Sequence, residues 1–163
     1  MVIAVLEVLE FNVVYQSNKF IFMNLAKKTI LFGVILLFFA VLIGAFGAHA
    51  LSELLAKNNK ANVFDTASRY HFYHGFALII FGILNQMYNE FRWQNIIVIC
   101  FLLGLIFFSG SLYLLSILNI SWLGAIAPIG GTLLLCGWAG LAYNIFINLP
   151  QSIPIHKQSD KEA

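Results

Sequence analysis

The stretch TILFGVILLFFAVLIGAFGAHA, residues 29–50, contains no charged residue. An α-helix needs about 20 mainly apolar residues to cross a hydrocarbon core roughly 30 Å thick, so this stretch is long enough to span a membrane. Three further mainly apolar stretches follow it, at residues 67–88, 94–118 and 123–147. The sequence therefore predicts an all-α fold: an integral membrane four-helix transmembrane bundle.

The composition of the chain supports a membrane location. Of its 163 residues 61% are hydrophobic and 10% are charged, whereas a soluble domain is about 25% charged. The formal net charge of +2 comes without a run of basic residues, which argues against nucleic acid as a partner. Cys100 and Cys136 both fall inside predicted spans, so we interpret them as packing residues rather than a disulfide framework. The lipid bilayer is the partner that the composition indicates.

The chain divides into three parts by composition. Residues 1–22 are mainly apolar but include two glutamates, which are costly inside a bilayer. Met23 is soon followed by a basic pair and a long apolar run, which is typical of a protein start. We expect a non-native or disordered extension over residues 1–22, a four-helix transmembrane domain over 23–150, and a short polar tail over 151–163.

The loop charges predict the orientation, because Lys and Arg are enriched in cytoplasmic loops. With four spans, one side of the membrane holds Lys27, Lys28, Arg92, Lys157 and Lys161. The other side holds Lys57, Lys60 and Arg69. This bias predicts that both termini, and with them the polar tail, are cytoplasmic.

Two histidines mark the start of the second predicted span. His71 and His74 are three residues apart, which places them on the same side of a helix. The same helix face continues with Leu78, Phe81 and Asn85, which follow at helical spacing. Because this face carries polar groups, we expect it to point into the bundle, with His74 within reach of a polar group on another span.

Other polar side chains are expected at the same level of the membrane. His49 follows the first span directly, and Ser109, Ser111 and Tyr113 lie in the second half of the third. With four antiparallel spans, these residues and both span-two histidines fall in the outer half of the membrane. The candidate polar cluster is therefore His49, His71, His74, Ser109, Ser111 and Tyr113, and we expect the partner of His74 to be His49, Ser109 or Tyr113.

Small residues predict where helices approach closely. The candidates are Gly44, Gly47 and Ala48 in the first span and Gly130, Gly131 and Gly137 in the fourth. Pro128 falls several residues inside the fourth predicted span, where a proline removes one backbone hydrogen bond and predicts a kink.

Four stretches in order carry a family resemblance: Gly44–His49, Tyr70–His74, Phe108–Tyr113, and Pro128–Gly131 followed by Gly137-Trp138. Together they resemble the YgdD-like family of small inner-membrane proteins, over about residues 25–147. The resemblance implies four membrane spans and a bacterial inner-membrane location, without an established activity, substrate or cofactor. This chain departs from the family in having His71 where members often have glutamine, and Ala127 where they often have threonine.

The candidate residues allow several functions. Three histidines could bind zinc or copper or carry a proton, but the chain has no HExxH or CxxC pattern and no carboxylate inside a span, so we predict no metal and no cofactor. The serines near the histidines lack a nucleophile-elbow context, so we predict no enzyme. The sequence favours a non-enzymatic structural or accessory membrane protein, with a homo-oligomer or another membrane protein as partner. An oligomeric channel or transporter that uses the polar cluster is the alternative.

Overall fold

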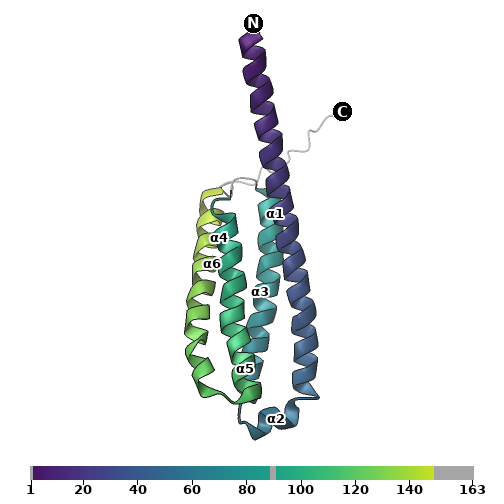
Figure 1. Ribbon diagram of the computed structural model, residues 1–163, viewed down its shortest axis with the longest axis vertical. Helices are drawn as coiled ribbons and strands as arrows, with labels where there is room; N and C mark the ends of the chain where they lie inside the picture. Colours follow the sequence, from purple (N-terminus) through teal and green to yellow (C-terminus); the bar gives the residue numbers. More distant parts are fainter. Residues whose placement is uncertain (1, 89–90, 149–163) are drawn as a thin grey trace, which may run out of the picture.

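The computed structural model describes residues 2–88 and 91–148, with their side chains from Leu25 onward. Within these ranges every regular element is helical (Figure 1). The elements are α1 (Val2–Ala48), α2 (Ser52–Lys57), α3 (Ala61–Met87), α4 (Gln94–Leu105), the π-helix η1 (Ile106–Gly110), α5 (Ser111–Leu118), the 3₁₀-helix η2 (Ser121–Ala125) and α6 (Ala127–Asn148).

The long helices lie side by side in a row. In the view of Figure 1 the order is α6, the continuous α4–η1–α5 rod, α3 and α1, and the main packing pairs are α1 with α3, α3 with α5, and α4 with α6. Consecutive long helices run in opposite directions, so α2 and η2 lie at one end of the row. The turn between α3 and α4 lies at the other end. This row leaves grooves on both sides of α3.

Three helical segments of the described chain are long and apolar enough to cross a membrane: Leu25–Ala48, Gln94–Leu118 and Ser121–Asn148. The second predicted span corresponds to α3, which is long enough but less apolar, because its first half carries an ion pair and two histidines. Length and composition alone therefore support three spans where the sequence predicts four.

The first helix is much longer than a membrane span. Its 47 residues extend over roughly 70 Å, and its N-terminal part projects beyond the other helices in Figure 1. The expected boundary at Met23 falls inside this unbroken helix, and a native start at Met23 stays a prediction. The expected tail at 151–163 lies outside the described residues.

Glycines bring α1 and α3 into close contact. A Cβ added to Gly33 would come within 2.8 Å of the carbonyl oxygen of Gly75, and one added to Gly82 within 3.0 Å of the carbonyl oxygen of Ala26. Ala40 is fully buried in the same helix pair. Small residues thus let the two backbones approach, as in other membrane helix pairs.

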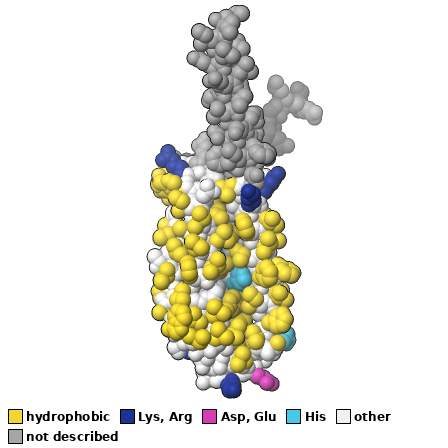
Figure 2. All heavy atoms as spheres, viewed as in Figure 1, with side chains coloured by type: hydrophobic (Ala, Val, Ile, Leu, Met, Phe, Trp, Pro, Cys, Tyr) yellow, Lys and Arg dark blue, Asp and Glu magenta, His cyan; other side chains and the backbone are white. Residues whose placement is uncertain are grey.

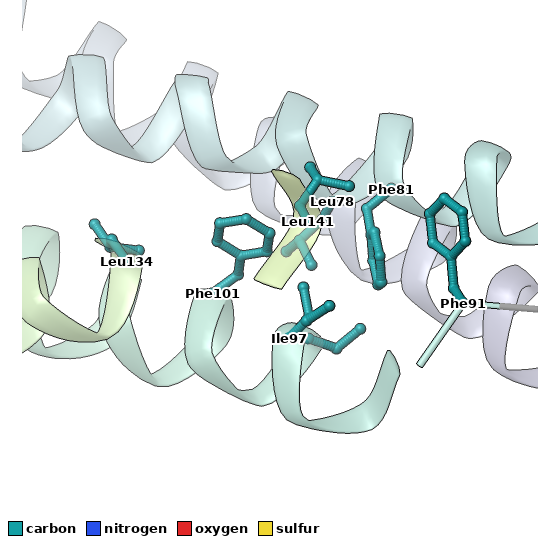
Figure 3. Packing of buried hydrophobic residues seen from close by; sticks show 8 residues of the cluster. Leu78, Phe81, Phe91, Ile97, Phe101, Leu134 and Leu141 are labelled. Atoms are coloured by element: carbon teal, nitrogen blue, oxygen red, sulfur yellow. The ribbon is translucent and has the colours of Figure 1, made fainter. Parts of the chain in front are cut away.

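Large side chains fill the space between α3, α4 and α6. Figure 3 shows these residues, which are Leu78, Phe81, Phe91, Ile97, Phe101, Leu134 and Leu141. Leu78, Phe81 and Phe101 have no exposed surface. The predicted interior face of the second span is therefore the face of α3 that contacts the core.

Helix α6 packs tightly against the π-helix of the α4–η1–α5 rod. A Cβ on Gly130 would collide with the backbone of Phe107 and Phe108 and lie 2.8 Å from the carbonyl oxygen of Gly104. Farther along α6, a Cβ on Gly137 would lie 2.9 Å from the ring of Phe101. Both glycines were among the packing residues that the sequence predicts.

The expected kink at Pro128 is wrong. The residues before it form η2 rather than the start of a long helix, so Pro128 is the second residue of α6. In the first turn of a helix the missing backbone N–H has no intrahelical partner to lose, and proline is tolerated there.

Three buried amides fix the turn between α3 and α4. The Asn144 side chain on α6 accepts a hydrogen bond from the backbone N–H of Arg92 (2.6 Å) and donates one to the Arg92 carbonyl (3.0 Å). The Asn85 amide donates to Gln94 Oε1 (2.8 Å), and the Gln94 amide donates to the carbonyl of Phe91 (2.8 Å). The turn is thereby held to both of its flanking helices and to α6.

Charged and apolar side chains occupy different parts of the surface. Figure 2 shows charged residues near the two ends of the described part and a hydrophobic surface between them. Large side chains such as Phe38, Leu135 and Phe146 are 65%, 70% and 87% exposed on this surface. An exposed apolar surface of this extent is suited to contact with lipid.

Candidate functional site

His74 is buried between α3 and α6. Its Nδ1 lies 2.8 Å from the carbonyl oxygen of Tyr70, one turn earlier in α3. The indole N–H of Trp138 on α6 donates to His74 Nε2 at 3.2 Å. His74 therefore faces the bundle interior and has a polar partner on another long helix, but that partner is Trp138 and not His49, Ser109 or Tyr113.

The two contacts define the protonation state of His74. An indole N–H can only donate, so Nε2 must accept and carries no proton. A carbonyl oxygen can only accept, so Nδ1 carries the proton. The neutral Nδ1–H form of His74 satisfies both contacts at once, whereas a protonated ring would lose the bond from Trp138.

Aromatic rings surround His74. Tyr70 stacks on it with a centroid distance of 5.9 Å, and the rings of Phe101 and Trp138 lie at 5.9 and 6.1 Å. Phe101 and Trp138 also contact each other edge to face at 5.4 Å. This packing holds the imidazole in one orientation.

His71 points toward a different part of the fold. Its Nδ1 lies 3.4 Å from the Tyr113 hydroxyl on α5, at the long end of the hydrogen-bond range, and its Nε2 has no partner. The Ser109 hydroxyl is buried without a partner as well. His71, Ser109 and Tyr113 all line one groove, so the structure brings these three predicted residues together.

The remaining members of the predicted cluster lie apart from this groove. The Ser111 hydroxyl donates to the carbonyls of Phe107 and Phe108 in its own helix. His49 lies just past the end of α1 with an exposed side chain, and its carbonyl accepts a hydrogen bond from Ser52. The structure thus divides the predicted cluster among several environments.

Three of the predicted packing residues have space around them. A Cβ on Gly44 would meet only the Ser68 hydroxyl, at 3.5 Å, and one on Gly131 only the Phe108 ring, at 3.6 Å. Ala48 is exposed. A Cβ on Gly47, by contrast, would collide with the Phe64 ring, which would have to move to make room for a side chain. The predicted ridge on α1 is thus tight at Gly47 and open at Gly44.

Three of the grooves formed by the described residues lie along α3. The first, which we call the His71 groove, has a volume of about 240 Å³ and lies between α1 and the α4–η1–α5 rod. The second, the His74 groove, has a volume of about 470 Å³ and lies between α3, η1 and α6, with Tyr70, Phe108 and Trp138 in its walls. The third, of about 290 Å³, lies near α2 and includes Asp65.

Asp65 is paired at the end of α3 nearest α2. Arg69 Nε donates to its carboxylate at 2.9 Å, one helical turn away. This hydrogen bond holds the pKa of the Asp65 carboxyl below its ordinary value. Both side chains are more than half exposed, so the pair contributes little to stability.

His74 lies at half the length of its helix. It is thirteen residues after Ala61 and thirteen before Met87, and Trp138 is near the middle of α6. Ser109 and Tyr113 are closer to the end at which α2 and η2 lie. The site therefore extends from mid-height toward that end, deeper than the outer-half position that the sequence predicts for His74.

The arrangement is poorly suited to metal binding or acid–base catalysis. In the part of the chain that the structure describes, no three His, Cys, Asp or Glu residues lie close enough to hold a metal ion. His74 uses both ring nitrogens in hydrogen bonds, and no carboxylate lines the His71 or His74 groove. What the site offers is a pair of unpartnered polar atoms next to an apolar groove.

Two important residues carried signals that the sequence interpretation did not use. Trp138 places an indole N–H in the middle of an apolar span, where a donor needs an acceptor. Asn144 is an isolated amide in the same span, and its burial without a partner would be costly. Each signal points to an interhelical bond, but the partner of each becomes visible only in the fold.

Comparisons with known proteins agree with a membrane location. The family model described as "Protein of unknown function (DUF423)" matches residues 43–131. This match includes His71, His74, Ser109 and Tyr113. No solved structure is significantly similar to the chain.

The relatives are bacterial proteins, and the alignments cover most of their length. The chain is 39% identical over 121 residues to a UPF0382 membrane protein of Staphylococcus haemolyticus, an alignment that covers 74% of the chain and 96% of that protein. It is 36% identical over 112 residues to the UPF0382 membrane protein YwdK of Bacillus subtilis, covering 69% and 90%. Neither name mentions an enzymatic activity, and the narrower YgdD-like label stays a resemblance.

Proposed function

Because the chain belongs to the DUF423 family of membrane proteins, we propose that it is a four-span, non-enzymatic structural or accessory protein of the bacterial inner membrane. Both termini are in the cytoplasm in this proposal. The three apolar segments supply three spans, and α3 supplies the fourth.

The geometry of the row supports α3 as a span. Helix α3 starts at the end of the row where α1 finishes and reaches the opposite end, where α4 begins. It also packs along the length of α1. Its polar residues His71, His74 and Asn85 are 6%, 4% and 1% exposed, so lipid does not contact them. Neighbouring helices therefore shield the groups that make α3 less apolar than the other spans.

The charges support the proposed orientation. Lys27, Lys28 and Arg92 lie toward the end of the row that holds the turn between α3 and α4. The opposite end holds Lys57, Lys60 and Arg69, with Glu53 and Asp65 nearby. A basic pair beside the first span favours the cytoplasm for that end, because Lys and Arg set orientation while acidic residues have little effect.

The observation that carries the non-enzymatic role is that the buried polar side chains connect helices. His74 bonds to Trp138, Asn85 to Gln94, and Asn144 to the backbone of Arg92. Asn58 likewise donates to the carbonyl of Ser116 at 3.0 Å. Such bonds fix helix register and produce a rigid body, which suits a scaffold.

A transporter would need a path between the helices. In the described ranges, Leu78, Phe81 and Phe101 close the centre of the row and have no exposed surface. A single copy is therefore unsuited to carry solute, and an oligomer would have to build the path at its contacts. This distinction can be measured.

The test combines crosslinking with flux. A photoreactive amino acid at Phe38 on α1 or Phe146 on α6, both exposed, should form a discrete adduct with a specific membrane protein in native membranes. The full chain in liposomes should give no proton flux or solute entry above empty liposomes. Flux that rises with protein content, together with adducts only to lipid, would overturn the accessory role.

A further inference from the structure

The His71 groove exists because α1 packs chiefly on α3. The rod of α4, η1 and α5 contacts the neighbouring face of α3, so the two flanking elements leave a gap between them. Leu36 and Ile43 form one wall of this gap, and Leu102 and Ile106 belong to the other. Its surface is almost wholly apolar, and in the four-span arrangement proposed above it opens toward lipid.

Two polar atoms without partners lie just beneath this surface. Ser109 and His71 line the groove and are 2% and 6% exposed, yet Ser109 Oγ and His71 Nε2 make no hydrogen bond. A buried polar group without a partner typically costs about 1–3 kcal/mol. Two of them at one groove indicate a site that is completed by something other than this chain.

Ser109 differs from several other hydroxyls in the helices. Thr29, Ser111, Ser116 and Thr132 each donate to a carbonyl of their own helix, three or four residues back. Ser109 lies in the π-helix, whose wider turn changes the position of the preceding carbonyls, and single π-turns are frequent at functional sites. Its hydroxyl is therefore available, and rotation about χ1 is the motion that would bring it to the groove surface.

The depth and charge of the groove limit what can bind. His71 is ten residues after the start of α3, and Ser109 is nine before the end of α5, so both lie about 14–15 Å inside the helix ends. That depth is within the hydrocarbon core, below the level of phospholipid headgroups. No Lys, Arg, Asp or Glu lines the groove, so a charged ligand would be buried without a counterion.

We propose that the His71 groove binds a neutral, membrane-dissolved alcohol or carbonyl compound. Its apolar body lies between α1 and the α4–η1–α5 rod, and its oxygen hydrogen-bonds to Ser109 and His71. The Ser109 hydroxyl can donate or accept a hydrogen bond, and His71 Nε2 does either according to the tautomer of the ring. A ligand carbonyl can therefore accept from both groups, and a ligand hydroxyl can accept from one and donate to the other. At about 240 Å³ the groove exceeds the 150 Å³ engineered cavity that holds benzene, so it has room for part of a chain or one substituted ring.

The test uses a long-chain alcohol that carries a diazirine, added to liposomes containing the full chain. The matched probe is the alkane with the same diazirine. After illumination, mass spectrometry locates the labelled residues. We expect the alcohol to label residues of the His71 groove saturably and more strongly than the alkane.

Four variants test separately the hydrogen bonds to the ligand oxygen and the room for its apolar body in the His71 groove. Ser109→Ala should lower labelling by the alcohol about fivefold, the effect of one hydrogen bond, and leave the alkane unchanged. His71→Gln should retain labelling, because an amide also donates and accepts. Gly110→Leu should abolish labelling by both probes, because Gly110 lines the groove and a Cβ there meets no atom within 4 Å. Gly131→Leu, in the His74 groove, is the matched control and should have no effect.

Folding and labelling have separate readouts. Ser109→Ala removes only an unpartnered hydroxyl, so thermal stability should stay equal or rise while labelling falls. Equal labelling by alcohol and alkane in the natural sequence, or an unchanged ratio in Ser109→Ala, would overturn the proposal. Failure of the four-span arrangement would instead appear as a wrong topology, which is measured independently of labelling.

Discussion

Gly130→Ala is expected to destabilise the protein more than any other single-methyl change. The added Cβ would meet the backbone of Phe107 and Phe108 in η1 and the carbonyl oxygen of Gly104, and no side-chain rotation can relieve a backbone collision. Overpacking of this kind typically costs about 1–3 kcal/mol, and we expect the upper end of that range. The measurement is SDS titration of the purified protein, followed by circular dichroism.

The adjacent glycine provides the control for this prediction. A Cβ on Gly131 meets only the Phe108 ring at 3.6 Å, an ordinary contact. Because alanine favours helix over glycine by about 0.8–1 kcal/mol, Gly131→Ala should be neutral or stabilising. If both variants were equally stable, α6 would not contact η1 as described.

Asn144→Leu is expected to have the second-largest effect. Asn144 is fully buried, and its amide makes the two hydrogen bonds that hold the Arg92 backbone and a third to the carbonyl of Gly140. Leucine keeps a similar volume but leaves the Arg92 N–H and carbonyl without these partners. Each hydrogen bond contributes about 0.5–1.5 kcal/mol, so losing the three should cost about 2–3 kcal/mol in the same titration.

Asn148→Leu is the matched substitution one helical turn later. Asn148 is only partly buried, and its amide bonds within α6, to the Asn144 carbonyl at 3.0 Å. We expect a change below about 0.5 kcal/mol. Equal losses in the two variants would show that the clamp on Arg92 does not stabilise the turn.

The sequence predicts the helices and the interior face of α3 well. Apolar stretches separated by short polar turns identify the long helices, and the three- and four-residue spacing from His71 to Asn85 identifies the buried face. These are local properties, because a helix places its side chains according to the spacing alone. The same reasoning fails at Pro128, where the boundary between η2 and α6 depends on a turn that has no clear sequence signal.

The order of the helices in space could not be predicted in the same way. The spacing places His71 and His74 on one face, yet His74 meets Trp138 on α6 while His71 meets Tyr113 on α5. The order of the helices depends on close backbone contacts, such as Gly33 with Gly75 between α1 and α3 and Gly104 with Gly130 between α4 and α6. His49 could not be separated from the cluster either, because the chain turns away beyond α1.

The most direct test of the four-span arrangement is whether α3 crosses the membrane. In a background with Cys100→Ala and Cys136→Ala, single cysteines replace Lys57 at the end of α2 and Asn95 at the start of α4, both of which are exposed. A membrane-impermeant maleimide added to spheroplasts with an intact inner membrane should label Lys57→Cys directly. It should label Asn95→Cys only after the membrane has been permeabilised. Labelling of both positions from the same side would show that α3 does not cross, and would contradict the four-span arrangement.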